Sequence, residues 1–166
     1  MEFVAQLCVD QLAEGRYFLH EHPKLATSWE LECMRRLRLI PGVSVVRADQ
    51  CQYGAKAPSG PRKGSPVLNA TVFMPNTPEV LRELSRRCTG TSMQCSRPGG
   101  GNHTPCAGSI CKDMARYPRE LCRAVLRGIA AQLKADGRMQ PGCYGVQMAD
   151  DESGNEQLYS PEQGYS

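Results

Sequence analysis

The fold prediction depends most on one stretch, Arg16-Tyr17-Phe18-Leu19-His20-Glu21-His22-Pro23. An apolar run leads directly into three ionisable side chains, and a proline then ends regular ladder pairing. This pattern predicts a buried β-strand over 16–20 that delivers His20, Glu21 and His22 to the rim of an α/β sheet, where ligands of open sheets bind. On a strand, the two histidines lie on one side and Glu21 lies on the other.

A helix is predicted before this stretch, and helices and strands are predicted after it. Apolar spacing predicts a helix over 2–14, and Thr27 with Glu30 fits a capping box at the start of a second helix. Val43, Val45 and Val46 predict a second strand that ends near residues 47–49 and runs parallel to the first in a strand–helix–strand unit. The third strand, 67–74, has no helix before it, so we expect it to pair antiparallel.

Two further helices complete the predicted elements. Thr77 as N-cap and Pro78 at the first helical position start one helix, and Tyr117-Pro118 opens the last one. We therefore predict that residues 1–137 form a partial Rossmann-like α/β domain of about three strands flanked by helices. Residues 138–166 are rich in Gly, Gln, Ser and acidic side chains, and we predict a disordered tail there.

The composition is that of an ordinary globular protein with an excess of cysteine. The chain has 166 residues, of which 40% are apolar and 22% are charged, and its net charge is +3. No apolar run is long enough to span a membrane and no signal peptide is recognisable, so we expect an intracellular protein, cytoplasmic or nuclear. The nine cysteines are then reduced thiols or metal ligands rather than a disulfide framework.

Cysteine and histidine residues of the irregular region 88–116 form the candidate metal site. His103 and Cys106 have the spacing of a zinc half site, which Cys88 or Cys111 could complete, so the candidate ligands are Cys88, His103, Cys106 and Cys111. A zinc ion would staple a glycine-rich segment that has no regular element of its own. The alternative interpretation is a mobile loop with free thiols.

The segment 55–66 is the candidate nucleic-acid contact. Its glycines and prolines predict a flexible loop rather than a helix or strand. Lys56, Arg62 and Lys63 give that loop a positive charge, which suits phosphate groups of DNA or RNA.

Two other constellations support chemistry less well. His20 and His22 lack the helical His-Glu-x-x-His spacing of zinc proteases. A hydrolase that uses Cys51 or Cys88 with a histidine has no local sequence signature in this chain.

Four stretches follow one another in a recognisable order: Phe18-Leu19-His20-Glu21-His22-Pro23, Val45-Val46-Arg47-Ala48-Asp49, Gln52-Tyr53-Gly54 and Thr71-Val72-Phe73-Met74-Pro75-Asn76. Through these stretches the sequence resembles the middle segment of cytosine-5 DNA methyltransferases, and also a domain of copia-like retroelement polyproteins of the algal type. In that family a strand ending in Glu-Asn-Val is followed by a helix, a strand, a Tyr/Phe-Gly turn and a reversed final strand. The resemblance implies that Glu21 matches the base-contacting glutamate, with His22 in place of the asparagine.

The same resemblance implies an incomplete enzyme. The family's glycine-rich cofactor loop, acidic ribose ligand and Pro-Cys nucleophile are absent from this chain, so methyl transfer has no mechanism here. We therefore expect a catalytically incomplete domain, with no catalytic residue, that contacts DNA or RNA through Glu21 and the loop 55–66. The resemblance also implies an upstream half in a longer polyprotein. A small zinc-stapled interaction module centred on 88–111 is the alternative.

Overall fold

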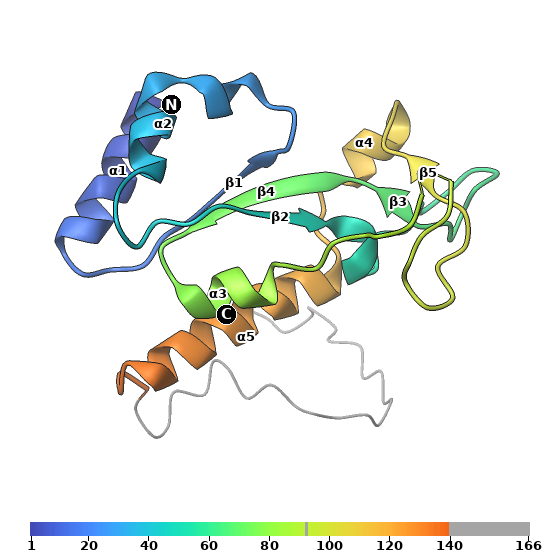
Figure 1. Ribbon diagram of the computed structural model, residues 1–166. Coiled ribbons are helices and arrows are strands. Elements are labelled where there is room, and N and C mark those ends of the chain that lie inside the picture. The colour runs from blue at the N-terminus through green and yellow to red at the C-terminus, as the bar shows by residue number, and fades with distance from the viewer. Residues whose placement is uncertain (92, 140–166) are drawn as a thin grey trace, which may run out of the picture.

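The computed structural model describes residues 1–91 and 93–139 (Figure 1). In chain order its elements are α1 (Glu2–Ala13), β1 (Leu19–Pro23), the 3₁₀ turn η1 (Thr27–Glu30), α2 (Glu32–Arg38), β2 (Val46–Asp49), the 3₁₀ turn η2 (Gln50–Tyr53), β3 (Val67–Leu68), β4 (Ala70–Pro75), α3 (Pro78–Glu83), β5 (Thr104–Pro105), α4 (Ser109–Asp113) and α5 (Arg119–Ala135). The predicted tail lies outside the described residues from 140 onward. Among the described helices, none combines the length and the apolar character needed to cross a bilayer.

Three strands form the central sheet in the order β1–β4–β2, and β4 pairs antiparallel with both neighbours. The mixed α/β class and the antiparallel final strand are therefore confirmed. β1 and β2 run in the same direction, as predicted, but β4 lies between them. The strand–helix–strand unit thus contains no directly paired parallel strands, and β1 is an edge strand rather than the buried centre of the sheet.

Neighbouring residues of β4 divide the core into two halves, because successive side chains of a strand point to opposite faces. Phe73 packs with Tyr53 and with buried residues of α3 and α5. Met74 packs with Trp29 and with buried residues of α1 and α2. Figure 1 shows the result: α1 and α2 cover one face of the sheet, and α3 and α5 cover the other.

The first strand begins three residues later than predicted, because the side chain of Asn76 forms hydrogen bonds with the backbone just before β1. The side-chain oxygen of Asn76 (Oδ1) accepts a hydrogen bond from the Phe18 N–H at 2.8 Å, and its side-chain Nδ2 donates one to the Arg16 carbonyl at 2.9 Å. These groups are therefore not available to the ladder with β4. As a result β1 extends past His20 and also contains Glu21 and His22, which were expected just beyond the strand.

The predicted capping box at Thr27 is wrong. Residues Thr27–Glu30 form a 3₁₀ turn, and Leu31 is extended before α2 begins. The buried Trp29 explains this break, because its indole N–H donates to the Pro23 carbonyl at 3.1 Å and anchors the turn to the end of β1. A continuous helix would carry the indole away from that carbonyl.

The other predicted helices are confirmed in position. α1 covers the predicted 2–14 to within a residue, α5 begins directly after Pro118, and α3 has Thr77 as N-cap and Pro78 as its first residue. α3 ends at Glu83, earlier than its apolar pattern predicts. The Tyr53 hydroxyl donates to the Glu83 carbonyl at 3.0 Å and accepts from the Arg86 N–H at 3.1 Å, which ends the helix against η2.

The predicted strand 67–74 is divided at Asn69 into β3 and β4. β3 pairs in parallel with β5, so it belongs to a separate two-stranded sheet. Buried Ala55, Ala57 and Val67 pack there against partly buried residues of α4 and its flanks. The segment 55–66 is thereby held as an ordered excursion, with the Ala57 N–H donating to the Ser65 carbonyl at 2.9 Å.

Candidate metal centre

Four side chains from three parts of the chain converge beyond the end of β2. The thiols of Cys51, Cys88 and Cys95 and a ring nitrogen of His103 all lie within 4.8 Å of one another. The Cys88 sulfur is 4.0 Å from the Cys95 sulfur and 3.6 Å from the His103 Nε2. This cluster could hold a metal ion.

These separations match the edges of a metal-centred tetrahedron. With Zn–S near 2.3 Å and Zn–N near 2.0–2.1 Å, tetrahedral angles place two sulfurs about 3.8 Å apart and a sulfur and nitrogen about 3.6 Å apart. The observed 4.0 Å and 3.6 Å lie within a few tenths of an ångström of those values. The Cys88 sulfur thus lies at distances that a single ion requires from two of the other donors, and all four donor atoms lie within 4.8 Å of one another.

The sheet supplies the first ligand and a hairpin supplies two others. Cys51 is fully buried in η2, which follows β2 without a break. Cys95 and His103 lie on opposite arms of a hairpin around the glycine turn 99–101. The Cys95 N–H donates to the Gly101 carbonyl at 2.9 Å, and the His103 N–H donates to the Met93 carbonyl at 2.8 Å. Both ligands thus have fixed backbone positions.

The tautomer of His103 is set by its second ring nitrogen. Nδ1 lies 3.0 Å from the Thr91 carbonyl oxygen, which can only accept, so Nδ1 carries the proton. The lone pair of Nε2 then faces the sulfurs. Histidine ligands of metals make the same kind of hydrogen bond, which fixes the ring and increases its basicity.

Asp49 positions the fourth ligand, Cys88. Its carboxylate is fully buried at the end of β2 and accepts from the Cys88 backbone N–H at 2.9 Å. The same carboxylate accepts from Arg47 at 2.8 Å and from Arg87 at 3.2 Å, so its charge is balanced. Asp49 therefore joins the strand that precedes Cys51 to the backbone that carries Cys88.

Hydrogen bonds to sulfur favour the thiolate at Cys88. Burial by itself raises the pKa of this thiol, but the Ser96 hydroxyl and N–H, together with the Gly90 backbone, bring the pKa down to about 6. Both Ser96 donors lie 3.5 Å from the sulfur. The Arg97 N–H similarly donates to the Cys95 sulfur at 3.5 Å. Such N–H···S contacts stabilise negative sulfur.

Cys51 behaves in the opposite way. Burial is the main cause, and the nearby Cys95 and Cys88 thiols add to it, so the pKa of Cys51 is raised far above its ordinary range. Without a cation among them, three sulfurs at this spacing cannot all be ionised. A bound cation reverses that balance because a coordinated thiol is deprotonated outright. The cluster thus has the electrostatics of a cation site.

The structure groups the predicted ligands differently from the sequence prediction. Cys88 and His103 belong to the cluster, but their partners are Cys51 and Cys95. Cys106 and Cys111 lie next to one another instead, with their sulfurs 3.4 Å apart. The sequence contains one signal for the observed grouping, because Cys95 and His103 stand four residues before and four after Gly99 in the turn Pro98-Gly99-Gly100-Gly101.

Glu21 and the histidines occupy opposite sides of β1, as predicted. His20 and His22 have ring centroids 5.2 Å apart, and His20 packs edge-on against Trp29 at 5.3 Å. Glu21 lies on the other side beside Tyr117, whose pKa is raised by burial and by its hydrogen bond to Glu21. These three residues are not part of the cysteine–histidine cluster.

The basic residues of the loop 55–66 are exposed, as their predicted role requires. Lys56, Arg62 and Lys63 are open to solvent, and none of them forms a salt bridge with a residue in the described part of the chain.

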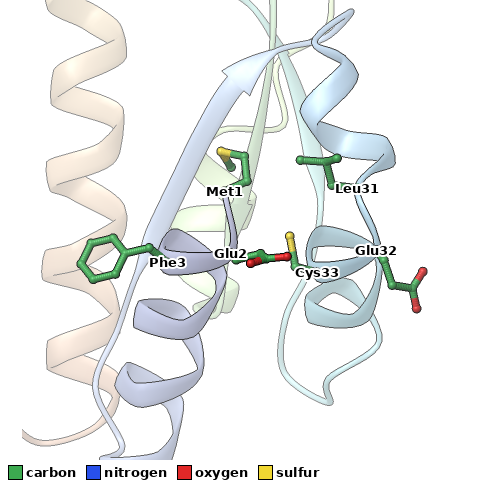
Figure 2. Close-up of a pocket in the computed structure, with 6 residues that line it drawn as sticks. All are labelled: Met1, Glu2, Phe3, Leu31, Glu32 and Cys33. Carbon is green, nitrogen blue, oxygen red and sulfur yellow. The ribbon is translucent and has the colours of Figure 1, made fainter.

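An open recess of about 520 Å³ between α1 and α2 shares no residue with the cysteine–histidine cluster. Figure 2 shows its lining: Phe3 and Glu32 point away from one another, and Glu2 points towards Cys33. No set of polar groups converges on one point there. We therefore take the cysteine–histidine cluster as the candidate functional site.

Comparison with known proteins finds no matching family model, curated protein or solved structure.

Proposed function

We propose that this protein is a small zinc-stapled interaction module, with Cys51, Cys88, Cys95 and His103 as ligands of one structural zinc ion. The observation that carries the proposal is the convergence of the four donor atoms within 4.8 Å of one another, with two separations from the Cys88 sulfur close to the edges of a tetrahedral shell. The hydrogen bond from the His103 ring to a carbonyl supports it, because that bond leaves Nε2 free to coordinate.

The donor set favours zinc over harder cations. Three thiolates and one imidazole suit a borderline-soft ion, whereas Mg²⁺ and Ca²⁺ prefer oxygen ligands. Four protein ligands also complete the tetrahedron, so no position is left for water or substrate. Closed sites of this kind are structural, and open ones are catalytic. The proposed role of the metal is therefore to hold the hairpin 93–103 against the sheet.

Zinc analysis of the purified full-length chain tests this proposal directly. Native protein should contain one zinc per chain by elemental mass spectrometry. Cys51→Ser and Cys95→Ser should reduce that content to a small fraction, because three ligands hold zinc far less tightly than four. Cys106→Ser and Cys111→Ser are matched controls from the same region and should retain the metal. Zinc loss in the controls together with retention in Cys51→Ser would assign the site to the other set of cysteines and contradict the proposal.

The second candidate is the nucleic-acid contact of a catalytically incomplete, methyltransferase-like domain. Charge supports the contact: residues 47–138 contain 15 Lys and Arg against 6 Asp and Glu, whereas residues 1–46 contain 5 against 6. Lys56 and Arg97 line a recess of about 100 Å³ beside the glycine turn. A recess of that size with two cations suits one phosphate group. The antiparallel final strand β4 agrees with the reversed strand of the methyltransferase resemblance.

Binding to a fluorescent single-stranded oligonucleotide tests this second candidate. The observed association constant should fall with salt, and Lys56→Gln combined with Arg97→Gln should reduce the magnitude of the log–log slope by roughly 0.7, the contribution of one phosphate of a single strand. Arg35→Gln with Arg36→Gln, which removes two exposed cations of α2, is the control and should leave the slope unchanged. Equal effects of both pairs would show that the contact is unspecific. Methylation of DNA by the purified protein would contradict the incomplete-enzyme proposal.

A further inference from the structure

Cys106 and Cys111 form a second pair of thiols that the metal cluster does not use. Their sulfur atoms are 3.4 Å apart, and the two residues are joined by a turn that contains Gly108. Cys106 follows β5 and is half-buried, whereas Cys111 lies in α4 and is exposed. The sulfurs must approach by only about 1.4 Å to reach the S–S bond length of about 2.0 Å.

We propose that Cys106 and Cys111 are a redox modification site, which a small-molecule disulfide such as oxidised glutathione converts into an intrachain disulfide. In the first step the Cys111 thiolate attacks one sulfur of the oxidant and releases one molecule of thiol. In the second step Cys106 loses its proton to solvent, attacks the Cys111 sulfur and releases the second molecule of thiol. Two protein thiols are oxidised and one external disulfide is reduced to two thiols.

The surroundings of the two sulfurs assign this order of attack. Cys111 is exposed, so an external disulfide can reach it. Burial and the neighbouring Cys111 thiol raise the pKa of Cys106 to about 11, so Cys106 is the poorer first nucleophile and the better-placed resolving thiol. Exposure of one thiol and proximity of a second are the features that distinguish reversible redox cysteines from inert buried ones.

A Cys106–Cys111 disulfide would restrain α4, which few other contacts hold in place. α4 has five residues and is held by the small cluster that includes Cys106, Ile110 and Met114. A covalent bond from Cys111 to Cys106 would join α4 to β5, the strand that directly follows the ligand His103. Oxidation would therefore restrain α4 against the excursion 55–66 without removing any ligand of the metal cluster. This proposal stands whether or not zinc is the metal bound there.

The test uses the full-length protein, both as purified and after metal removal by a chelator. Each sample is equilibrated with glutathione at several ratios of disulfide to thiol, alkylated, and digested with trypsin. The peptide 88–112 contains Cys88, Cys95, Cys106 and Cys111, and fragmentation locates any bridge within it. We expect one Cys106–Cys111 bridge in this peptide. Its mass should be lower by two hydrogens, and two alkyl groups should be missing. The bridge should form at a ratio of glutathione disulfide to thiol at which Cys122 is still alkylated.

Variants and metal content separate this outcome from its alternatives. Cys106→Ser should trap glutathione on Cys111, because the resolving thiol is gone, whereas Cys122→Ser should leave the bridge unchanged. Zinc content measured on the same samples should not fall as the bridge forms. Glutathione on both Cys106 and Cys111 of the native chain, or a bridge that joins either of them to Cys88 or Cys95 in metal-loaded protein, would overturn the proposal. Protein that contains no zinc as purified and still forms the bridge would contradict the zinc proposal but not this one.

Discussion

Asp49 is the residue on which the position of Cys88 depends most clearly. It is completely buried, and its carboxylate receives a backbone N–H and two arginines. A buried carboxylate is costly unless its oxygens are hydrogen-bonded and its charge is balanced. The three donors meet that need, and in doing so they connect β2 to the segment that follows α3.

Asp49→Asn tests this connection without a large change in volume. The amide cannot accept from all three donors, and its own N–H₂ group faces them, so we expect a loss of about 2–4 kcal/mol in the free energy of unfolding. Zinc affinity should fall by roughly 10–100-fold, as when other outer-shell partners of a metal site are removed. Denaturation and competitive chelator titration measure the two effects. Glu30→Gln, which removes an exposed partner of Arg35, is the control and should change neither.

The pH dependence of stability contains a contribution from His20. Burial, followed by the neighbouring His22, lowers the pKa of His20 below its ordinary value of 6.5. The folded state therefore binds a proton less readily than the unfolded state. The contribution of His20 to stability is complete above pH 6.5 and is lost as the pH falls through the lower pKa of the folded state.

Proton NMR of the imidazole signals checks this contribution. We expect the His20 signal of the folded protein to titrate below 6.5, and the His20→Gln variant to have a shallower loss of stability between pH 6.5 and 5 in zinc-saturated buffer. A His20 pKa at or above 6.5 would contradict the expected effect of burial.

At the scale of elements, the contact between α3 and α5 depends on Gly128. A Cβ at this position would lie 2.6 Å from the Val80 Cα and 3.0 Å from the Val80 nitrogen, which are backbone atoms that cannot rotate away. The absence of a side chain on α5 therefore lets α3 approach to backbone contact. This close approach buries Val80 in the same cluster as Leu121 and Ala124.

Gly128→Ala has two opposing effects, and their sum tests this contact. Helix propensity alone would stabilise α5 by about 1 kcal/mol. Overpacking against the α3 backbone should cost about 1–3 kcal/mol, so we expect a net loss of stability of up to about 2 kcal/mol. Urea denaturation measures the sign. A gain in stability would show that α3 and α5 do not approach this closely in solution.

The elements that the sequence predicts well are those whose pattern is local. The helices α1 and α5 follow from apolar spacing over several turns, and the start of α3 follows from Thr77-Pro78. The boundaries that differ were moved by side chains from elsewhere. Asn76 holds the backbone before β1, and Trp29 anchors the turn before α2. The pairing of β3 with β5 joins segments about 37 residues apart, which no local pattern reports.

The candidate metal site could be predicted only in part for the same reason. Cys88 and His103 were recognised because they lie in one irregular region. Cys51 is separated from Cys88 by 36 residues, and only the antiparallel sheet and the interaction of Tyr53 with the end of α3 bring them together. Cys106 was expected as a ligand because it is near His103 in sequence, but β5 leads it away from the cluster.

At the scale of the whole molecule, the two main hydrophobic clusters contain none of the four residues that we propose as zinc ligands. The sheet and its covering helices can therefore retain their packing when the metal is removed. The hairpin 93–103 has few buried apolar side chains, and among its residues only Cys95 and His103 are buried. We expect metal removal to release this hairpin and to leave the three-layer core in place.

Hydrogen exchange of metal-loaded and chelated protein distinguishes these two regions. Amides of 93–103 should exchange at least ten times faster after chelation, whereas those of β4 and α5 should keep most of their protection. Uniform loss of protection would show that the whole fold requires the metal. Unchanged exchange in 93–103 would show that the hairpin does not depend on it.

X-ray absorption at the zinc edge of the loaded protein measures directly whether one zinc ion is bound by three sulfurs and one imidazole. The proposed ligand set predicts a four-coordinate shell of three sulfurs at about 2.3 Å and one nitrogen at about 2.0–2.1 Å, with the outer-shell scattering of a single imidazole ring. Cys51→Ser should reduce the sulfur count to two in any zinc that remains. A shell dominated by oxygen, or one in which the sulfur count falls in Cys111→Ser but not in Cys51→Ser, would contradict the claim.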